Sequence, residues 1–281
     1  MAILQALRQR ARRRLLSSGG LSALDWLPVQ LMLGFAKGDT GVLDRLGNVT
    51  LEYDPRSVIG RQLFVSGAFE DREIRFFQKL LSTIDQPVVL DVGANLGVHA
   101  LSWAKSHAGS RIFAFEPSRQ TLAFLRRNVE QNGLSGQVEV IEQALSDTCG
   151  IAEFFHCEDD AYSSLRDTRR KRVVDKYRVK LNTIDQFVQS KELARVDLIK
   201  IDVEGLEREV LVGGERVLKD LRPHLFVEIY GGTDSNPDPA GTIEFVRSRG
   251  YDAFVLKNGI PEPYIAHSDA FFNYYFRPTA D

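Results

Sequence analysis

Short apolar runs that end at turn residues alternate along residues 70–280 with stretches whose apolar residues recur at helical spacing. Runs that are apolar at nearly every position predict strands buried on both faces of a parallel sheet, and the helical stretches predict the helices that cover it. The predicted strands are Val88–Asp91, Arg111–Phe115, Val138–Gln143, a run that ends at Asp202, His224–Tyr230, Asp252–Leu256 and Phe271–Phe276. This order predicts an α/β fold with a Rossmann-like, doubly wound sheet of seven mostly parallel strands, one of them antiparallel.

The predicted helices are one of about 14 residues after Glu70, one that includes His99–Ala104, Thr121–Gln131, Glu207–Leu218 and Pro239–Gly250. An insertion follows the third strand, because Ala152–His156 and Tyr177–Leu181 alternate polar and apolar residues like an antiparallel ribbon. The polar loop Asp159–Lys176 lies between them and carries the basic run Arg169–Arg172. Long loops beside an active site often contact substrate, so this run either meets an anionic acceptor or, more commonly, is solvated surface.

The chain divides into residues 1–66, a predicted N-terminal extension of helix and strand, and residues 67–281, one domain with an insertion at about 150–182. Within the extension, Leu4, Leu7, Ala11 and Leu15 fall near helical spacing among five arginines. A basic amphipathic helix of this kind can make a weak contact with an anionic membrane surface. The commoner alternative is a charged helix that packs its few leucines on its own domain.

Composition narrows the function further. The chain has 281 residues, 43% hydrophobic and 26% charged, as in an ordinary globular protein. Its net charge of −2 provides no basic surface for nucleic acid. Cys149 and Cys157 form neither a metal-ligand pattern nor a disulfide scaffold, which predicts a cytoplasmic protein with reduced thiols. Carboxylates at the strand ends can hold a divalent metal, but the chain has no metal-ligand motif, so no metal site is predicted. No apolar run approaches the roughly 20 residues that span a bilayer, and the first residues lack the features of a signal peptide.

The first strand ends in the motif D-V-G-A-N-L-G, in which Gly93 and Gly97 frame a tight loop before a helix. The motif is not the G-x-G-x-x-G of dinucleotide-binding proteins, and the chain has no P-loop. Asp91, at the tip of the strand, would repel a phosphate but suits a cationic ligand. Glu116 ends the second strand, where a carboxylate can accept hydrogen bonds from both hydroxyls of a ribose, and Pro117 keeps it extended. Adenosine with a positive centre and no phosphate describes S-adenosylmethionine.

A second motif, V-D-L-I-K-I-D-V-E-G, places Asp202 and Glu204 at the same carboxyl edge of the sheet. Both are candidates for a general base, with His99 and His156 in reserve. Lys200 faces the same side of its strand as Asp202, and its charge would lower the pKa of Asp202 and weaken it as a base. Helix capping is the alternative role for either acid.

Five motifs, D-V-G-A-N-L-G, F-E-P, A-L-S-D, L-N-T-I-D and I-K-I-D-V-E-G, occur in this order between about Phe69 and Tyr230. They resemble the FkbM-type class I S-adenosylmethionine-dependent methyltransferases. The resemblance implies O-methylation of a hydroxyl on a sugar, polyketide or other secondary metabolite, and it places the acceptor beside Asp202–Gly205. It does not extend to the N-terminal region or to residues 159–172. The predicted cofactor-binding residues are Asp91, Gly93, Ala94, Asn95, Gly97, Glu116, Pro117, Ala144 and Asp202, with Ala144 either the floor of an adenine pocket or a small turn residue.

Three other functions fit these motifs less well than O-methyl transfer. An enzyme that methylates nucleic-acid bases is expected to have an Asn/Asp-Pro-Pro-aromatic loop where this chain has D-V-E-G. A nicotinamide-dependent oxidoreductase is disfavoured because the phosphate-binding loop is missing. A silent binding or scaffold module on the same fold has no need to retain Gly93, Gly97, Asp91 and Glu116. The sequence therefore predicts an O-methyltransferase whose partner is a small-molecule or glycan hydroxyl.

Overall fold

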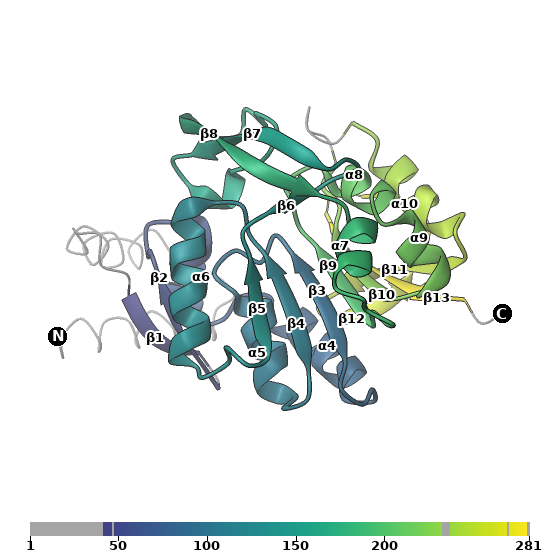
Figure 1. Ribbon diagram of the computed structural model, residues 1–281, viewed down its shortest axis with the longest axis horizontal. Coiled ribbons are helices and arrows are strands. Elements are labelled where there is room, and N and C mark those ends of the chain that lie inside the picture. The colour runs from purple at the N-terminus through teal and green to yellow at the C-terminus, as the bar shows by residue number, and fades with distance from the viewer. Residues whose placement is uncertain (1–41, 47, 232–236, 269, 280–281) are drawn as a thin grey trace. The chain divides into compact units, whose positions relative to one another are not determined.

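The computed structural model describes residues 42–46, 48–231, 237–268 and 270–279, in two compact units that divide between Asp71 and Arg72 (Figure 1). The predicted basic helix near the N-terminus, and with it the predicted membrane contact, lies outside the described residues. In the described part of the chain, no helix combines the length and the apolar character needed to cross a bilayer.

The first unit contains a hairpin and a helix. Strands β1 (Val42–Leu46) and β2 (Val49–Tyr53) pair antiparallel, which confirms the predicted strand character of this segment. Helix α3 (Val58–Ser66) begins where the Ser57 hydroxyl accepts a hydrogen bond from the Gly60 amide at 3.0 Å. It ends at Gly67, whose φ of +73° is the left-handed conformation that glycine adopts readily.

The second unit is built on an eight-stranded sheet with the order β12-β11-β13-β10-β9-β3-β4-β5. Strands β3, β4, β5, β9 and β10 are parallel, and β13 runs antiparallel to β10 and β11. The strands are β3 (Val88–Val92), β4 (Arg111–Phe115), β5 (Val138–Ile141), β9 (Leu198–Ile201), β10 (His224–Glu228), β11 (Tyr251–Lys257), β12 (Ile260–Pro263) and β13 (Asn273–Pro278). The predicted doubly wound, mostly parallel sheet is confirmed.

The predicted count of seven strands is one too low. Strand β12 pairs with β11 through a hairpin whose two turn residues, Asn258 and Gly259, have φ values of +54° and +73°. Two consecutive positive φ angles are characteristic of the tight turn that Asn-Gly favours between antiparallel strands. The dipeptide Asn258-Gly259 therefore indicates this hairpin from the sequence alone.

Helices cover both faces of the sheet, which explains why its central strands are apolar throughout. On one face, Phe77 of α4 (Asp71–Leu81) stacks on Phe226 of β10 at 4.8 Å and meets Trp103 of α5 (Val98–Ser106) edge-on. On the other face, buried side chains of four helices pack against the central strands. These helices are α7 (Ile184–Ser190), α8 (Glu207–Val212), α9 (Glu215–Asp220) and α10 (Pro239–Arg247). Helix α6 (Arg119–Gln131) connects β4 to β5.

The predicted single helix over Glu207–Leu218 is wrong, because Gly213 and Gly214 separate α8 from α9. A Cβ atom on Gly213 would lie 2.0 Å from the backbone oxygen of Ser146, so only glycine fits where these segments touch. Two adjacent glycines also have low helix propensity. Close packing against the turn after β6 therefore interrupts the helix.

The insertion forms a second, three-stranded sheet with the order β6-β8-β7. Strands β7 (Gly150–Cys157) and β8 (Val173–Asn182) pair antiparallel, which confirms the predicted ribbon, and β6 (Ala144–Leu145) runs parallel to β8. A short 3-10 helix, η1 (Asp160–Tyr162), follows β7. In Figure 1, β7 and β8 cross beyond the upper ends of the central strands, where ligands bind in sheets of this kind.

Candidate functional site

The loop after β3 is clamped between the ends of two neighbouring strands. Gly93 has a φ of +76°, and its amide and that of Ala94 both donate to the backbone oxygen of Phe115, at 3.1 and 2.9 Å. A Cβ atom on Gly93 would lie 1.8 Å from the backbone oxygen of Asp202. The first glycine of the motif is therefore required by both its backbone angle and its contact with the end of β9.

Asp91 is fully buried beneath this loop. Its Oδ2 accepts a hydrogen bond from the Ala100 amide at 3.2 Å, in the first turn of α5. The N-terminus of this helix is the position that holds the pyrophosphate in dinucleotide-binding folds, because free amides and the helix dipole attract an anion there. The protein's own carboxylate already takes that place. The geometry thus disfavours a phosphate at this loop, as the sequence predicts.

Lys200 joins the strand ends. Its side chain is only 4% exposed, and its Nζ donates to the backbone oxygen of Gly93 at 2.9 Å and to Asp202 Oδ2 at 3.3 Å. Asp91 Oδ1 lies 3.5 Å from the same ammonium group. The predicted placement of Lys200 beside Asp202 is thus present, and a buried cation balances the carboxylates of β3 and β9.

Glu116, at the end of β4, is the most informative acid of the site. Only 6% of the surface of Glu116 is exposed. Its two carboxylate oxygens accept hydrogen bonds from the Asn95 amide at 2.9 Å and the Ser118 amide at 2.8 Å. Burial, followed by the charge of Asp160, raises the pKa of Glu116 to about 8. Each carboxylate oxygen can accept more than one hydrogen bond, so both retain capacity for a ligand's hydroxyls.

These features satisfy the chemical requirements of an adenosine cofactor that lacks phosphate. The glycine loop brings backbone close to the strand ends, Glu116 provides acceptors for a ribose, and an acid occupies the helix N-terminus. The structure brings together Asp91, Gly93, Ala94, Asn95, Gly97, Glu116 and Asp202 of the predicted set. Pro117 follows Glu116 directly. Ala144 is buried against Phe154 and Val179 of the inserted sheet, and its place in an adenine pocket stays a prediction.

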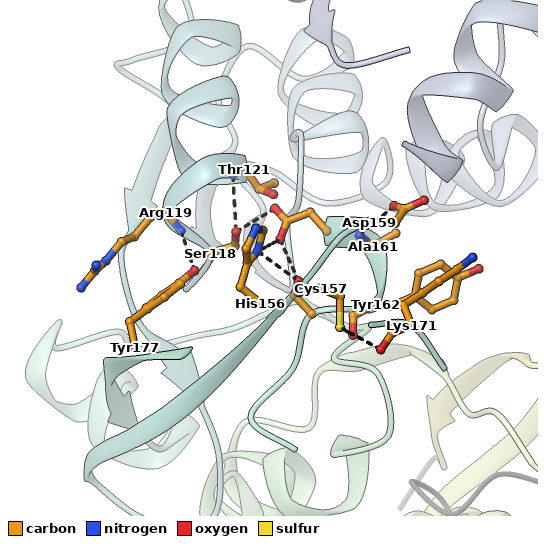
Figure 2. Close-up of polar contacts among 12 residues, drawn as sticks. Ser118, Arg119, Thr121, His156, Cys157, Asp159, Ala161, Tyr162, Lys171 and Tyr177 are labelled. Carbon is orange, nitrogen blue, oxygen red and sulfur yellow. Dashed lines mark hydrogen bonds and ion pairs between the residues drawn. The ribbon is translucent and has the colours of Figure 1, made fainter. Parts of the chain in front are cut away.

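A polar network that the sequence did not predict links the insertion to Glu116. Ser118, whose amide binds Glu116, donates its hydroxyl to Asp160 Oδ2 at 2.7 Å. Asp160 Oδ1 in turn lies 3.0 Å from His156 Nδ1, and the contact with Asp160 raises the pKa of His156. Figure 2 shows His156 beside Ser118, and Tyr177 reaching Arg119, whose amide donates to the Tyr177 hydroxyl at 3.1 Å. His156 therefore faces this network rather than the second motif.

The insertion also contacts the loop after β9 and helix α8. Ser164 Oγ donates to the backbone oxygen of Val203 at 3.2 Å, and Arg166 forms an ion pair with Glu209 at 3.0 Å. Arg170 forms an ion pair with Glu204. Burial, with the nearby charge of Asp202, raises the pKa of Glu204 to about 8. Glu204 also adopts a φ of +59°, an uncommon backbone conformation that proteins concentrate at functional sites.

Glu207 and His99 lie at the edges of the candidate site. Glu207, which the sequence placed only in a helix, is buried and accepts a hydrogen bond from the Gly205 amide at 2.9 Å. Burial raises its pKa to about 7. His99 is buried against the rings of Trp103 and Phe226, at 5.3 and 5.8 Å, within the aromatic layer beneath the sheet. Across the described residues, no group of three His, Cys, Asp or Glu side chains could hold a metal ion.

Comparison with known proteins decides the family. Residues 91–253, more than half of the chain, match the methyltransferase FkbM domain. The chain belongs to the FkbM methyltransferase family. The match covers both motifs and the whole insertion, so the FkbM domain includes the carboxyl edge of the sheet with Glu116, Asp202 and Glu204.

The individual relatives described next are less than 30% identical to this chain in sequence. The hexuronic acid methyltransferase AglP of Haloferax volcanii is 29% identical over 150 residues, which cover 53% of this chain and 59% of AglP. The 2-O-methyltransferase NoeI of Sinorhizobium fredii is 26% identical over 165 residues, covering 53% of this chain and 67% of NoeI. A crystal structure of the methyltransferase FkbM from Methylobacillus flagellatus has 13% identity and a TM-score of 0.46 over 76% of this chain and 52% of that one. The chain thus spans about three fifths of the length of AglP.

Proposed function

We propose that this protein transfers a methyl group from S-adenosylmethionine to a hydroxyl of a sugar or another small molecule. The observation that carries the proposal is the pairing of a buried acid at the N-terminus of α5 with a second buried acid, Glu116, at the end of the neighbouring strand. The first acid disfavours phosphate, and the second offers acceptors to a ribose. Membership of the FkbM family supports the same reading.

Several residues would hold the cofactor. Glu116 would accept hydrogen bonds from the ribose, and the loop from Gly93 to Gly97 would approach the ligand with little side chain in the way. Lys200 fixes this loop through the Gly93 oxygen. When bound, S-adenosylmethionine supplies an electrophilic methyl group attached to a positively charged sulfur.

The acceptor side is formed by the second motif. A hydroxyl must lose its proton as it accepts the methyl group, and a carboxylate with a pKa near the working pH serves best as a base. Glu204, with its pKa raised to about 8, meets this condition better than Asp202, which is held by Lys200. We therefore place Glu204 as the proton acceptor and Asp202 as the residue that fixes the edge of the site.

The relatives support a hydroxyl acceptor. NoeI is named as a 2-O-methyltransferase and AglP as a methyltransferase of hexuronic acid. The first name indicates methylation of an oxygen and the second a sugar acid as substrate. In-line transfer requires the acceptor oxygen to lie about 3 Å from the methyl carbon, a geometry that a fixed carboxyl edge can enforce.

The first test is calorimetric titration of the purified protein with S-adenosylmethionine and S-adenosylhomocysteine, with NAD as the control. Micromolar binding of the first two ligands and none of NAD is the expected result. A chain that binds neither would leave the scaffold alternative in first place.

A second test separates the two acids. Glu204→Gln and Asp202→Asn are compared for kcat and for affinity toward S-adenosylhomocysteine, on any hydroxylated acceptor that is methylated. Glu204→Gln should lower kcat by roughly a hundredfold or more with little change in that affinity, which is the magnitude expected for loss of a general base. If Glu204→Gln turns over like the wild type while Asp202→Asn does not, Asp202 is the base instead.

A further inference from the structure

The four residues of the basic run Arg169–Arg172 differ sharply in their surroundings. Arg169, Lys171 and Arg172 are exposed, as a solvated run should be. Arg170 is turned inward, and only 24% of its side chain is exposed. The structure therefore shows that Arg170 differs from its three basic neighbours in exposure, a difference that the sequence alone does not indicate.

The guanidinium group of Arg170 lies between two aromatic rings. Its central carbon is 4.6 Å from the centre of the Tyr162 ring and 4.9 Å from that of Tyr230. Tyr230 is itself stacked on Phe272 at 4.5 Å. Rings in these positions hold a guanidinium group flat and oriented, which reduces the entropy lost when it binds a ligand.

Most of the hydrogen-bonding capacity of this arginine remains available. Nη1 pairs with Glu204, and the guanidinium group makes no other hydrogen bond to the residues that the structure describes. The hydroxyls of Tyr162 and Tyr230 likewise make no hydrogen bond within the described ranges. A guanidinium group carries five N–H donors, so those that do not pair with Glu204 can bind a ligand.

The position of Arg170 relates it to the reaction. Its partner Glu204 lies two residues after Asp202, whose backbone oxygen packs against Gly93 of the cofactor loop. Ser164, in the same inserted loop, is fastened to Val203 by its hydroxyl. The arginine is thus fixed at the acceptor side of the site, and its partner Glu204 lies two residues from Asp202, which contacts the loop proposed to hold the methyl donor.

We propose that Arg170, held between Tyr162 and Tyr230, forms a subsite for a carboxylate on the acceptor, so that the substrate is a sugar acid methylated on one of its hydroxyls. The planar guanidinium group matches a carboxylate with two parallel hydrogen bonds, and only one guanidinium of the basic run is turned inward. The proposal rests on the proposed function and narrows it to one class of acceptor. Arg170 acts here in substrate recognition and takes no part in the proton transfer.

The test uses two matched pairs of acceptors, phenyl β-D-glucuronide with phenyl β-D-glucoside and the galacturonide with the galactoside. Members of a pair differ only in the carboxylate. We expect the wild-type kcat/KM to favour the sugar acid of at least one pair by at least about tenfold, the range of a hydrogen bond to a charged group. Arg170→Gln should bring this ratio close to one, and Arg170→Lys should restore part of it.

Arg169→Gln is the matched control, because it removes the same charge from the neighbouring exposed residue and should keep the full ratio. Affinity for S-adenosylhomocysteine, measured on each variant, verifies that the cofactor side is still folded. Using the ratio within a pair cancels any effect of Arg170 on Glu204, because that effect is common to both sugars.

Four outcomes would overturn the proposal. Equal methylation of the two members in both pairs, or an unchanged ratio in Arg170→Gln, would do so while leaving the proposed methyl transfer intact. Methylation of none of the four sugars by a protein that binds S-adenosylhomocysteine would exclude the sugar-acid substrate. A product whose methyl group is released by mild alkali would be an ester of the carboxylate itself, contrary to the role given to Arg170. Absence of S-adenosylhomocysteine binding would instead refute the proposed function.

Discussion

Cofactor affinity should depend on pH through Glu116. This acid is buried, and its pKa is raised to about 8 by burial and by the charge of Asp160. Ribose hydroxyls donate hydrogen bonds, so they favour the ionised carboxylate over the neutral acid. Affinity for S-adenosylhomocysteine should therefore increase as the pH rises toward 8 and level off above it.

The size of the effect follows from the pKa. With a pKa of about 8, about 1% of Glu116 is ionised at pH 6 and half at pH 8. If only the ionised form accepts from the ribose, the dissociation constant falls by up to about fiftyfold between these pH values, or about 2 kcal/mol. Glu116→Ala removes these charged hydrogen bonds and should weaken S-adenosylhomocysteine binding by roughly 1–3 kcal/mol at high pH.

Protein stability should move in the opposite direction. Because the folded-state pKa lies above the ordinary value, Glu116 favours the folded protein at low pH, and this contribution is lost as the pH rises from about 4.5 to about 8. Ligand binding favours the ionised form. The increase in melting temperature caused by S-adenosylhomocysteine should consequently be larger at pH 8 than at pH 6, at about the same ligand concentration.

The assay is calorimetric titration with S-adenosylhomocysteine at intervals between about pH 6 and pH 9. The amino group of the ligand also titrates near this range, so the decisive quantity is the difference between the wild type and Glu116→Gln, which share that titration. The glutamine variant should lack the rise. If the two proteins show parallel pH profiles, Glu116 does not bind the ribose as an ionised acid, and the reading of the β4 end is wrong.

Three other substitutions test the surroundings of this acid. Asp160→Asn removes a charge that raises the pKa of Glu116, so the rise in affinity should shift to lower pH, and an unshifted profile would contradict the link between them. Lys200→Met leaves the buried carboxylate of β3 without its cation and should cost about 3–5 kcal/mol in urea unfolding, with a loss below about 1 kcal/mol as the contrary result. Gly93→Ala should abolish S-adenosylhomocysteine binding because its Cβ would lie 1.8 Å from a backbone oxygen, whereas Gly133→Ala, at a φ of +67° with open space around it, should bind normally.

The part of the site that the sequence predicted is encoded locally. Asp91, Gly93 and Glu116 each stand directly at the end of an apolar run, and the carboxyl ends of parallel strands necessarily meet at one edge. Strand alternation likewise placed Lys200 beside Asp202, and the structure has them 3.3 Å apart. Such inferences need only the strand periodicity and the direction of the chain.

The remainder depends on how the insertion folds over that edge. Asp160 reaches Ser118 across 42 positions of sequence, and Arg170 reaches Glu204 across 34. Asp160 lies in the three-residue helix η1 and Arg170 in the loop that follows, so no local pattern indicates which of four neighbouring basic residues turns inward. By contrast, the hairpin that adds β12 was readable from Asn258-Gly259, because the φ preference of that dipeptide is a local property.

One stretch of the insertion therefore serves both ligands. Its beginning holds Ser118, and with it the amide that binds Glu116, while its end places Arg170 against Glu204. Under the proposed roles, a change in the position of this stretch alters contacts on the cofactor side and the acceptor side together, so we expect the affinities of the two ligands to be coupled, and thermodynamic linkage makes that coupling reciprocal. The inserted loop, rather than the strands or the glycine loop, contributes the side chain proposed to select the acceptor.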